Sequence, residues 1–233
     1  MTQNEIYIVG TGKAVPEKIL TNKDLEKMVD TSDEWIRTRT GMSERRIADE
    51  NTAASDLSIE ASRNALESAG MKPEDIDLVI VGTISADYAF PATATIVQHK
   101  LGIPPCTAFD ISAACSGFLY GMSIASAMIN QKMAKNALVV GVEVLTKITN
   151  WEDRSTCVLF GDGAGAVILS HEGEHRLIDT YTKADGKYGE LLIRKAGGSR
   201  QPIDEQALAN KDDKIYMDGN KVLSSLLANA CSS

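Results

Sequence analysis

The sequence predicts an α/β protein with a mixed or parallel sheet, and three observations support this prediction. Short apolar runs of strand length recur along the first two thirds of the chain. Segments with apolar residues at helical spacing lie between these runs. The runs are nearly continuous rather than alternating, which is typical of strands that helices cover on both faces.

Four apolar runs are the expected strands of this sheet. They are IYIVG at 6–10, DLVIVGT at 77–83, TAFDI at 107–111 and ALVVGVEVL at 137–145. After Cys157 the pattern changes, and CVLFGDGAGAVILS at 157–170 is expected to form two apolar arms around a Gly-Asp-Gly turn. Extended segments are expected at 176–182 and 190–194, so antiparallel strands should replace helices there.

Three helices are expected between the strands. Thr52 is the expected N-cap of a helix that ends at Gly70, because Gly tolerates the left-handed conformation that follows a last helical turn. Pro91 and Gly102 bracket a second helix. The longest uncharged stretch, residues 111–131, carries too many serines and glycines for a bilayer span, so we expect a helix buried inside protein.

Composition excludes several classes of protein. The chain has 233 residues with 24 Lys plus Arg against 32 Asp plus Glu, a net charge of -8, which argues against a nucleic-acid partner. The four cysteines lack zinc-site spacing and no signal-peptide pattern opens the chain, so we expect a reduced, cytoplasmic protein without a membrane partner. Gly173 interrupts the helical spacing of His171 and His175, and no metal site is expected.

Cys115 is the candidate nucleophile. It stands in DISAACSGF, between an expected strand and the uncharged helix, and its small neighbours permit a tight turn. Such a turn projects the side chain, while the N-terminal end of the helix stabilises a thiolate that could accept an acyl group. A buried, unreactive cysteine at a helix start is an equally good interpretation of this local sequence.

Several motifs together decide between these interpretations. The segments DTSDEWIRTRTG at 30–41, FDISAACSGF at 109–118, WEDRST at 151–156 and FGDGAGAV at 160–167 resemble β-ketoacyl-[acyl-carrier-protein] synthase III, a thiolase-fold condensing enzyme of fatty acid biosynthesis. The resemblance runs from Ile6 to Val222. It implies a layered αβαβα fold and a decarboxylative Claisen condensation, in which Cys115 takes an acyl group from a short acyl-CoA and malonyl-carrier protein then supplies the attacking carbanion.

The resemblance also implies a coenzyme A site. Trp35 and Arg154 match the pair that sandwiches the adenine, since indole and guanidinium both stack on a π face. Thr31 and Arg39 match positions near the coenzyme, and Asn220 matches a contact to the pantetheine arm. Taken without the family, Trp35 would more often be a packing residue and Arg154 a surface cation.

The family also implies a homodimer that needs no cofactor beyond the coenzyme A thioester. Phe90 matches a residue that reaches across the dimer interface to bound the partner's acyl pocket; its alternative is ordinary core packing. The resemblance implies three parts: residues 1–170 as the complete N-terminal half with the nucleophile, 171–222 as the start of a C-terminal half that is largely missing, and 223–233 as an aberrant tail.

The family's remaining catalytic groups are not among these residues. The resemblance predicts a histidine in an HQAN context and an asparagine in a GNTS context, and neither motif occurs. A change of reading frame after Val222 is our hypothesis for the tail, because restoring one base to a chosen set of codons yields an amphipathic, family-like string. The competing interpretations are a catalytically incomplete, non-enzymatic fragment, or another thiolase-fold condensing enzyme such as a hydroxymethylglutaryl-CoA synthase or a secondary-metabolism ketosynthase.

Overall fold

The structure, a computed structural model, describes residues 5–230 and divides into two compact units. We call them the sheet unit and the small unit. The sheet unit comprises the residues up to Lys18, Arg46–Val144 and Asp162–Thr182; the small unit comprises Ile19–Arg45, Leu145–Gly161 and the residues from Lys183 onward. The expected division at 170 and 222 concerns halves of the family's full-length fold, and it stays a prediction.

The centre of the sheet unit is a mixed sheet. Within residues 5–230 it has six strands in the order β5-β4-β6-β7-β1-β8. Their bounds are β1 Tyr7–Ala14, β4 Leu78–Gly82, β5 Thr107–Ile111, β6 Ala137–Val144, β7 Asp162–Ser170 and β8 His175–Arg176. β4 pairs in parallel with β5 and β6, whereas β7 is antiparallel to both β6 and β1. The α/β class with a mixed sheet is therefore confirmed.

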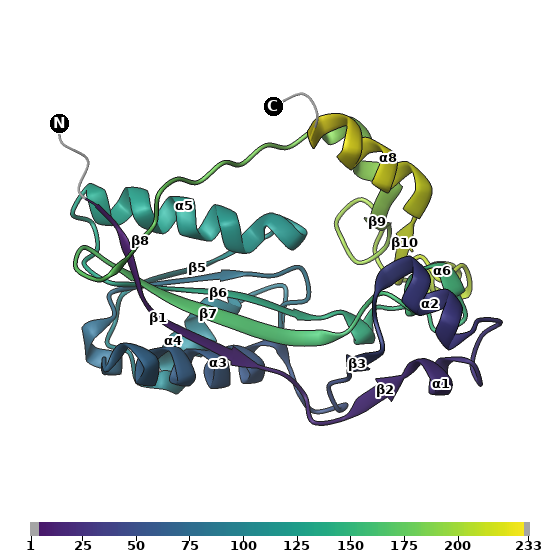
Figure 1. Cartoon of the computed structure of the whole chain (residues 1–233), viewed down its shortest axis with the longest axis horizontal. Coiled ribbons are helices and arrows are strands. Elements are labelled where there is room, and N and C mark those ends of the chain that lie inside the picture. The colour runs from purple at the N-terminus through teal and green to yellow at the C-terminus, as the bar shows by residue number, and fades with distance from the viewer. Residues whose placement is uncertain (1–4, 231–233) are drawn as a thin grey trace. The chain divides into compact units, whose positions relative to one another are not determined.

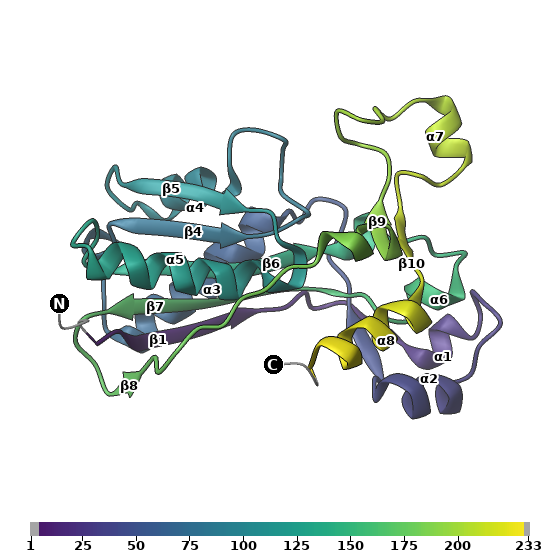
Figure 2. The same ribbon diagram turned by 90° about the horizontal axis from the view of Figure 1, so that it is seen from above.

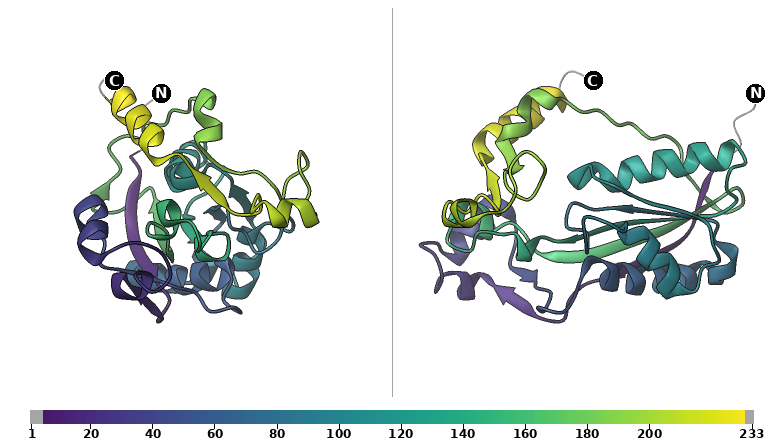
Figure 3. Two further views of the ribbon diagram at one scale, coloured as in Figure 1. Left: turned by 90° about the vertical axis from the view of Figure 1, so that its right-hand side faces the viewer. Right: turned by 180° about the vertical axis from the view of Figure 1, so that it is seen from behind.

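Helices cover both faces of this sheet (Figure 1). α3 (Ala54–Ala69) and α4 (Thr93–Leu101) lie on one face and α5 (Gly117–Asn130) lies on the other, which the view from above and the rear view show again (Figures 2 and 3). β4 explains the continuous apolar runs. Its Val79 and Val81 belong to the core under α3 and α4, while Leu78 and Ile80 belong to the core under α5. Neither face of the strand meets water.

The structure agrees with the expected C-terminal glycines of α3 and α4 but not with the expected N-cap of α3. α3 is preceded by Ala53 rather than by Thr52, so the predicted N-cap is wrong. Ala53 has no side chain that can cap the helix. Instead, the carboxylate of Asp56, in the first turn of α3, accepts the Ala53 N–H at 2.8 Å. Gly70 at φ +64° and Gly102 at φ +74° end α3 and α4 as expected.

The expected hairpin at 157–170 is also wrong. Its first arm does not form a strand, because Cys157 ends the short helix α6 (Arg154–Cys157) and packs with Val158, Leu25 and Ile36 in the core of the small unit. β7 begins inside the Gly-Asp-Gly segment and pairs with β6 instead. Of the extended segment at 176–182, only its first residue lies in a strand.

The small unit consists of short elements. They are β2 Ile19–Thr21, α1 Asn22–Leu25, α2 Asp33–Thr40, β3 Glu44–Arg46, α6, β9 Leu192–Arg194, α7 Glu205–Ala209, β10 Ile215–Met217 and α8 Gly219–Ala230; the last residue of β3, Arg46, is counted with the sheet unit. β2 pairs with β3, and β9 pairs with β10. α8 continues through Val222, where the sequence predicts an aberrant tail; residues 231–233 lie outside the described part. No helix in residues 5–230 is both long and apolar enough to span a bilayer.

Candidate active site

Cys115 lies at the junction of β5 and α5. It is the middle residue of a short 3₁₀ helix, Ala114–Ser116, and its side chain is exposed. Ala114 has φ +46°, a left-handed conformation that non-glycine residues rarely adopt. The turn is closed by a hydrogen bond from the Ser116 N–H to the Ala113 carbonyl at 3.1 Å. The thiol thus stands on a tight turn open to solvent, and the alternative of a buried cysteine does not describe this site.

Glycines bring the start of α5 against the sheet. A Cβ on Gly82 would lie 2.6 Å from the Gly117 carbonyl carbon, and a Cβ on Gly121 would lie 2.8 Å from a Val139 methyl group. Both distances are too short for real contacts, so the absence of side chains is what allows helix and strand backbones to touch. This close packing fixes the turn that carries Cys115.

The other described cysteines have different surroundings. Cys157 is fully buried, and burial raises the pKa of its thiol. Burial, followed by the charge of Asp77, also raises the pKa of Cys106, which is partly exposed. Because the thiolate is the reactive form, neither site favours nucleophilic chemistry. Cys231 lies outside the described residues.

A half-buried carboxylate holds the segment between β4 and α4. The Glu143 side chain at the end of β6 accepts the Ile84 N–H at 3.0 Å and the Ser85 hydroxyl proton. Burial raises the pKa of Glu143, and the hydrogen bonds that it accepts offset only part of this effect. Sequence analysis did not single out Glu143, although a lone acid in the apolar run GVEVL was the available signal.

Phe90 lies in this same segment and is 86% exposed. Core packing, the alternative interpretation of Phe90, is therefore wrong for this chain. Two further carboxylates fix the segment on either side of it: Asp87 accepts the backbone and hydroxyl protons of Ser55, and Asp110 accepts the amide protons that open α4. An exposed aromatic ring is thus carried by a firmly anchored loop.

The expected coenzyme residues Trp35 and Arg154 meet in the small unit. The Arg154 guanidinium lies 5.1 Å from the centre of the Trp35 ring, and that of Arg39 lies 5.9 Å from it. Arg154 also donates a hydrogen bond of 2.8 Å to the Asp30 carbonyl. The Ser32 hydroxyl caps α2 by accepting the Trp35 N–H at 3.1 Å. The two guanidinium groups and the indole therefore form a surface suited to an aromatic ring that bears phosphate groups. The flat groups stack on the ring, and the positive charges attract the phosphates.

Thr31 and Asn220 are placed differently. The Thr31 hydroxyl oxygen is buried and has no hydrogen-bond partner within residues 5–230. Asn220 is exposed in the first turn of α8, and among the described residues its side chain makes no hydrogen bond to Trp35, Arg39 or Arg154. Asn22 and Arg45, which the sequence did not mark as site residues, are buried beside this group of residues.

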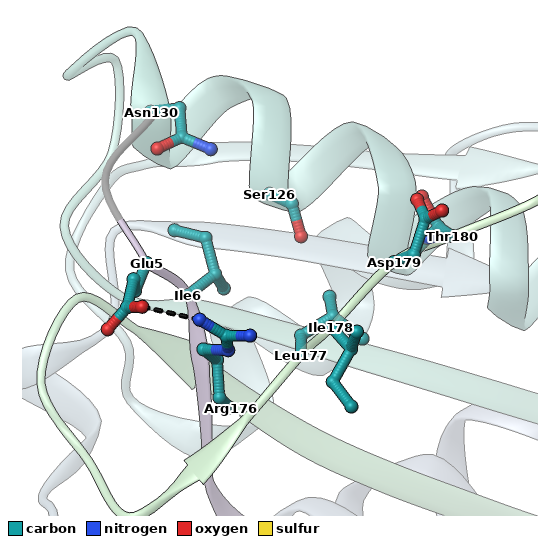
Figure 4. Close-up of a pocket in the computed structure, with 9 residues that line it drawn as sticks. All are labelled: Glu5, Ile6, Ser126, Asn130, Arg176, Leu177, Ile178, Asp179 and Thr180. Carbon is teal, nitrogen blue, oxygen red and sulfur yellow. Dashed lines mark hydrogen bonds and ion pairs between the residues drawn. The ribbon is translucent and has the colours of Figure 1, made fainter. Parts of the chain in front are cut away.

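A cavity of about 310 Å³ lies in the sheet unit beside α5 (Figure 4). The Ser126 hydroxyl and the Asn130 carbonyl oxygen are buried there without hydrogen-bond partners in the described residues. Glu5 and Arg176 neutralise each other at 2.6 Å. None of the predicted site residues lines the cavity. In residues 5–230 no group of three His, Cys, Asp or Glu side chains is placed to hold a metal ion.

Two family models match the chain. The model described as 3-Oxoacyl-[acyl-carrier-protein (ACP)] synthase III matches residues 109–186, and the model described as Stage V sporulation protein AD (SpoVAD) matches residues 19–147. Both matched ranges include Cys115. Relatives that match along nearly the whole chain distinguish the two families.

The chain is 54% identical to the β-ketoacyl-[acyl-carrier-protein] synthase III of Caldanaerobacter subterraneus subsp. tengcongensis, over 92% of this chain and 65% of the relative. It is 53% identical to that of Natranaerobius thermophilus, over 92% of this chain and 67% of the relative. The crystal structure of the synthase III from Aquifex aeolicus matches with a TM-score of 0.80 and 44% identity, over 94% of this chain and 67% of that chain.

These matches place the chain among the condensing enzymes with a thiolase-like fold. Within that class, it belongs to the β-ketoacyl-[acyl-carrier-protein] synthase III family. The other thiolase-fold enzymes considered above are not favoured. The chain spans about two thirds of the length of the curated relatives it matches.

Proposed function

We propose that this chain carries the acyl-transfer half of a synthase III reaction. The Cys115 sulfur, as thiolate, attacks the thioester carbonyl of a short acyl-CoA. The carbon–sulfur bond to the coenzyme breaks, coenzyme A leaves as its thiolate, and the acyl group stays on Cys115. The observation that carries the proposal is the exposed Cys115 on its glycine-packed turn, in a chain of this family.

The small unit supports this proposal with a site for the coenzyme. Trp35 and Arg154 offer a stacking face for the adenine, and Arg39 adds a second cation for its phosphates. Thr31 and Asn220 are proposed as further coenzyme contacts, from their match to the family alone. The coenzyme A thioester is the substrate, and the reaction needs no separate cofactor.

The second half-reaction is condensation with malonyl-acyl carrier protein, which would give a 3-oxoacyl product and begin fatty acid synthesis. Loss of CO₂ from the malonyl group leaves an enolate whose charge must be stabilised. The HQAN histidine and the GNTS asparagine that do this in the family are not among these 233 residues. A polypeptide of these residues alone should therefore stop at the acyl-enzyme.

A homodimer and a cytoplasmic location are part of the same proposal. The exposure of Phe90 on an anchored loop supports a role at a dimer interface. Size-exclusion chromatography with light scattering would test the dimer, with Phe90→Ala as the variant expected to weaken it.

The proposal is tested by intact-protein mass spectrometry after incubation with acetyl-CoA. One acetyl group should appear on Cys115, be absent in Cys115→Ala and remain in the matched control Cys106→Ala. Addition of malonyl-carrier protein should then yield no acetoacetyl product, whereas a longer version carrying both motifs should be faster by more than about 10²-fold. Absence of acetyl-Cys115 would favour the non-enzymatic fragment, and turnover by the short polypeptide would show that other residues replace the two absent groups.

A further inference from the structure

Two short helices of the small unit carry the Trp35–Arg154 pair. Trp35 lies on α2, which has eight residues, and Arg154 opens α6, which has four. Helices of this length are not stable by themselves in water, so their positions depend on the buried residues that contact them. Two buried polar residues, Asn22 and Arg45, lie between them; they are 1% and 4% exposed.

Arg45 binds the α6 side of this arrangement. Its Nε donates to the Val158 carbonyl at 2.9 Å, and its Nη2 donates to the same oxygen. Val158 is the C-cap residue of α6, whose last carbonyls lack partners within the helix. The guanidinium thus ends the helix that begins with Arg154.

Asn22 binds the α2 side. Its carbonyl oxygen accepts a hydrogen bond from Nη1 of Arg45, and its amide nitrogen donates at 2.8 Å to both the Asp33 carboxylate and the Met42 carbonyl. Asp33 is the first residue of α2, and Met42 follows the glycine that ends it. A continuous chain of hydrogen bonds therefore runs from both ends of α2 through Asn22 and Arg45 to the end of α6.

Burying the Arg45 cation is unfavourable for the stability of the fold. Burial lowers the pKa of Arg45, and among residues 5–230 the cation is compensated by a carbonyl and a side-chain amide rather than by a carboxylate. An apolar side chain would fill the same space without that cost. What an apolar side chain cannot do is fix the direction of two helices through directed hydrogen bonds.

We propose that Asn22 and Arg45 are positioning residues of the coenzyme site, which set the spacing of Trp35 and Arg154 by joining α2 to α6. This inference rests on the proposed role of Trp35 and Arg154 in binding the coenzyme. Neither positioning residue touches the substrate. Their loss should weaken recognition of the nucleotide and leave the reactivity of Cys115 unchanged.

The test uses Arg45→Lys, which keeps the charge but not the guanidinium fork, and Asn22→Ser. Arg46→Lys is the matched control, because the Arg46 guanidinium donates at 3.1 Å to the Pro16 carbonyl in the sheet unit. Each protein is titrated with coenzyme A by calorimetry. Acetylation of Cys115 is then timed with acetyl-CoA and with S-acetyl-N-acetylcysteamine, a thioester that lacks the nucleotide.

We expect both variants to bind coenzyme A about tenfold more weakly than the parent. Acetylation from acetyl-CoA below saturation should slow by the same factor, and acetylation from the short thioester should be unchanged. The double variant should lose little more than either single variant, because the two side chains act in one chain. The Arg46→Lys protein should match the parent in all three measurements.

Equal losses with both thioesters, or an equal loss in Arg46→Lys, would show a general structural effect and overturn the proposal. If Arg45→Lys does not fold, Asn22→Ser decides alone. If the parent chain binds coenzyme A but neither thioester acetylates Cys115, the proposed function fails, and calorimetry still decides the inference. Unchanged coenzyme affinity in the variants, or no affinity in the parent, would refute it.

Discussion

The two units hold their candidate functional residues by different means. In the sheet unit, Cys115 is placed by backbone packing, since the absence of side chains at Gly82 and Gly117 lets α5 touch β4. In the small unit, Trp35 and Arg154 are placed by side-chain hydrogen bonds on short helices. The difference predicts opposite sensitivities: added volume should disturb the candidate nucleophile, and loss of one polar group should disturb the proposed coenzyme site.

The apolar cores of the two units show the same contrast. The sheet unit has an extended core on each face of its sheet. The core of the small unit is a cluster whose buried members are Leu25, Ile36, Cys157 and Val158. With so little apolar area to bury, the small unit depends more on directed polar contacts for its shape.

The largest expected difference concerns the cysteines of the two units. Cys115 should react with iodoacetamide about a hundredfold faster than Cys157, because one thiol is exposed and burial raises the pKa of the other. Cys106 should also be slow. Mass mapping after limited labelling measures all three sites, and urea-unfolded protein is the control in which the rates should converge. Preferential labelling of Cys106 or Cys157 in folded protein would contradict the assignment of the nucleophile.

Removing a cation should have a smaller effect, confined to the small unit. Arg154→Ala should weaken coenzyme A binding about tenfold, since it removes the cation near the Trp35 ring, which is proposed to help bind the coenzyme. Trp35 fluorescence reports the titration, in a Trp151→Phe background that removes the second indole. Arg200→Ala, an exposed change in the same unit, is the control. An unchanged midpoint for Arg154→Ala would remove it from the site.

Added volume should affect the sheet unit instead. Gly82→Ala should lower the free energy of unfolding by about 1–3 kcal/mol, because the new methyl group would meet the α5 backbone. Gly165→Ala is the matched control, since a Cβ on this other strand glycine has no neighbour within 4 Å. Urea unfolding followed by circular dichroism measures both. Equal stability of the two variants would mean that α5 adjusts freely and that the turn at Cys115 is less constrained than argued above.

The smallest expected effect is a pH dependence in the sheet unit. Since burial raises the folded-state pKa of Glu143 above 4.5, its contribution to stability is fully present below that pH and is lost as pH rises through the folded-state value. Glu143→Gln removes this titration. The stability of the parent relative to Glu143→Gln should therefore fall between about pH 4 and pH 7. Parallel unfolding midpoints across that range would show that Glu143 is not desolvated.

The sequence alone predicted the features that depend on residues close together in the chain. Gly70 and Gly102 end helices because few other residues tolerate their conformation, and Cys115 could be placed between strand and helix from its small neighbours. Contacts between distant residues decided the rest. Cys157 begins an apolar run suited to a strand, yet it packs in a small helical core. No local pattern marks Arg45 for burial, because its acceptors lie 23 and 113 residues away in the sequence.

The interleaving of the two units affects the order in which the chain is made. On the ribosome, β1 is synthesised first, yet its partners in the sheet are β7 and β8, which follow about 150 to 170 residues later. Until then β1 has unpaired edges, while β4, β5 and β6 can already associate. Pairing β1 with strands so distant in the sequence costs conformational entropy of the intervening chain, and this cost precedes the stabilising contacts between the strands. The sheet is therefore completed late in the synthesis of the chain.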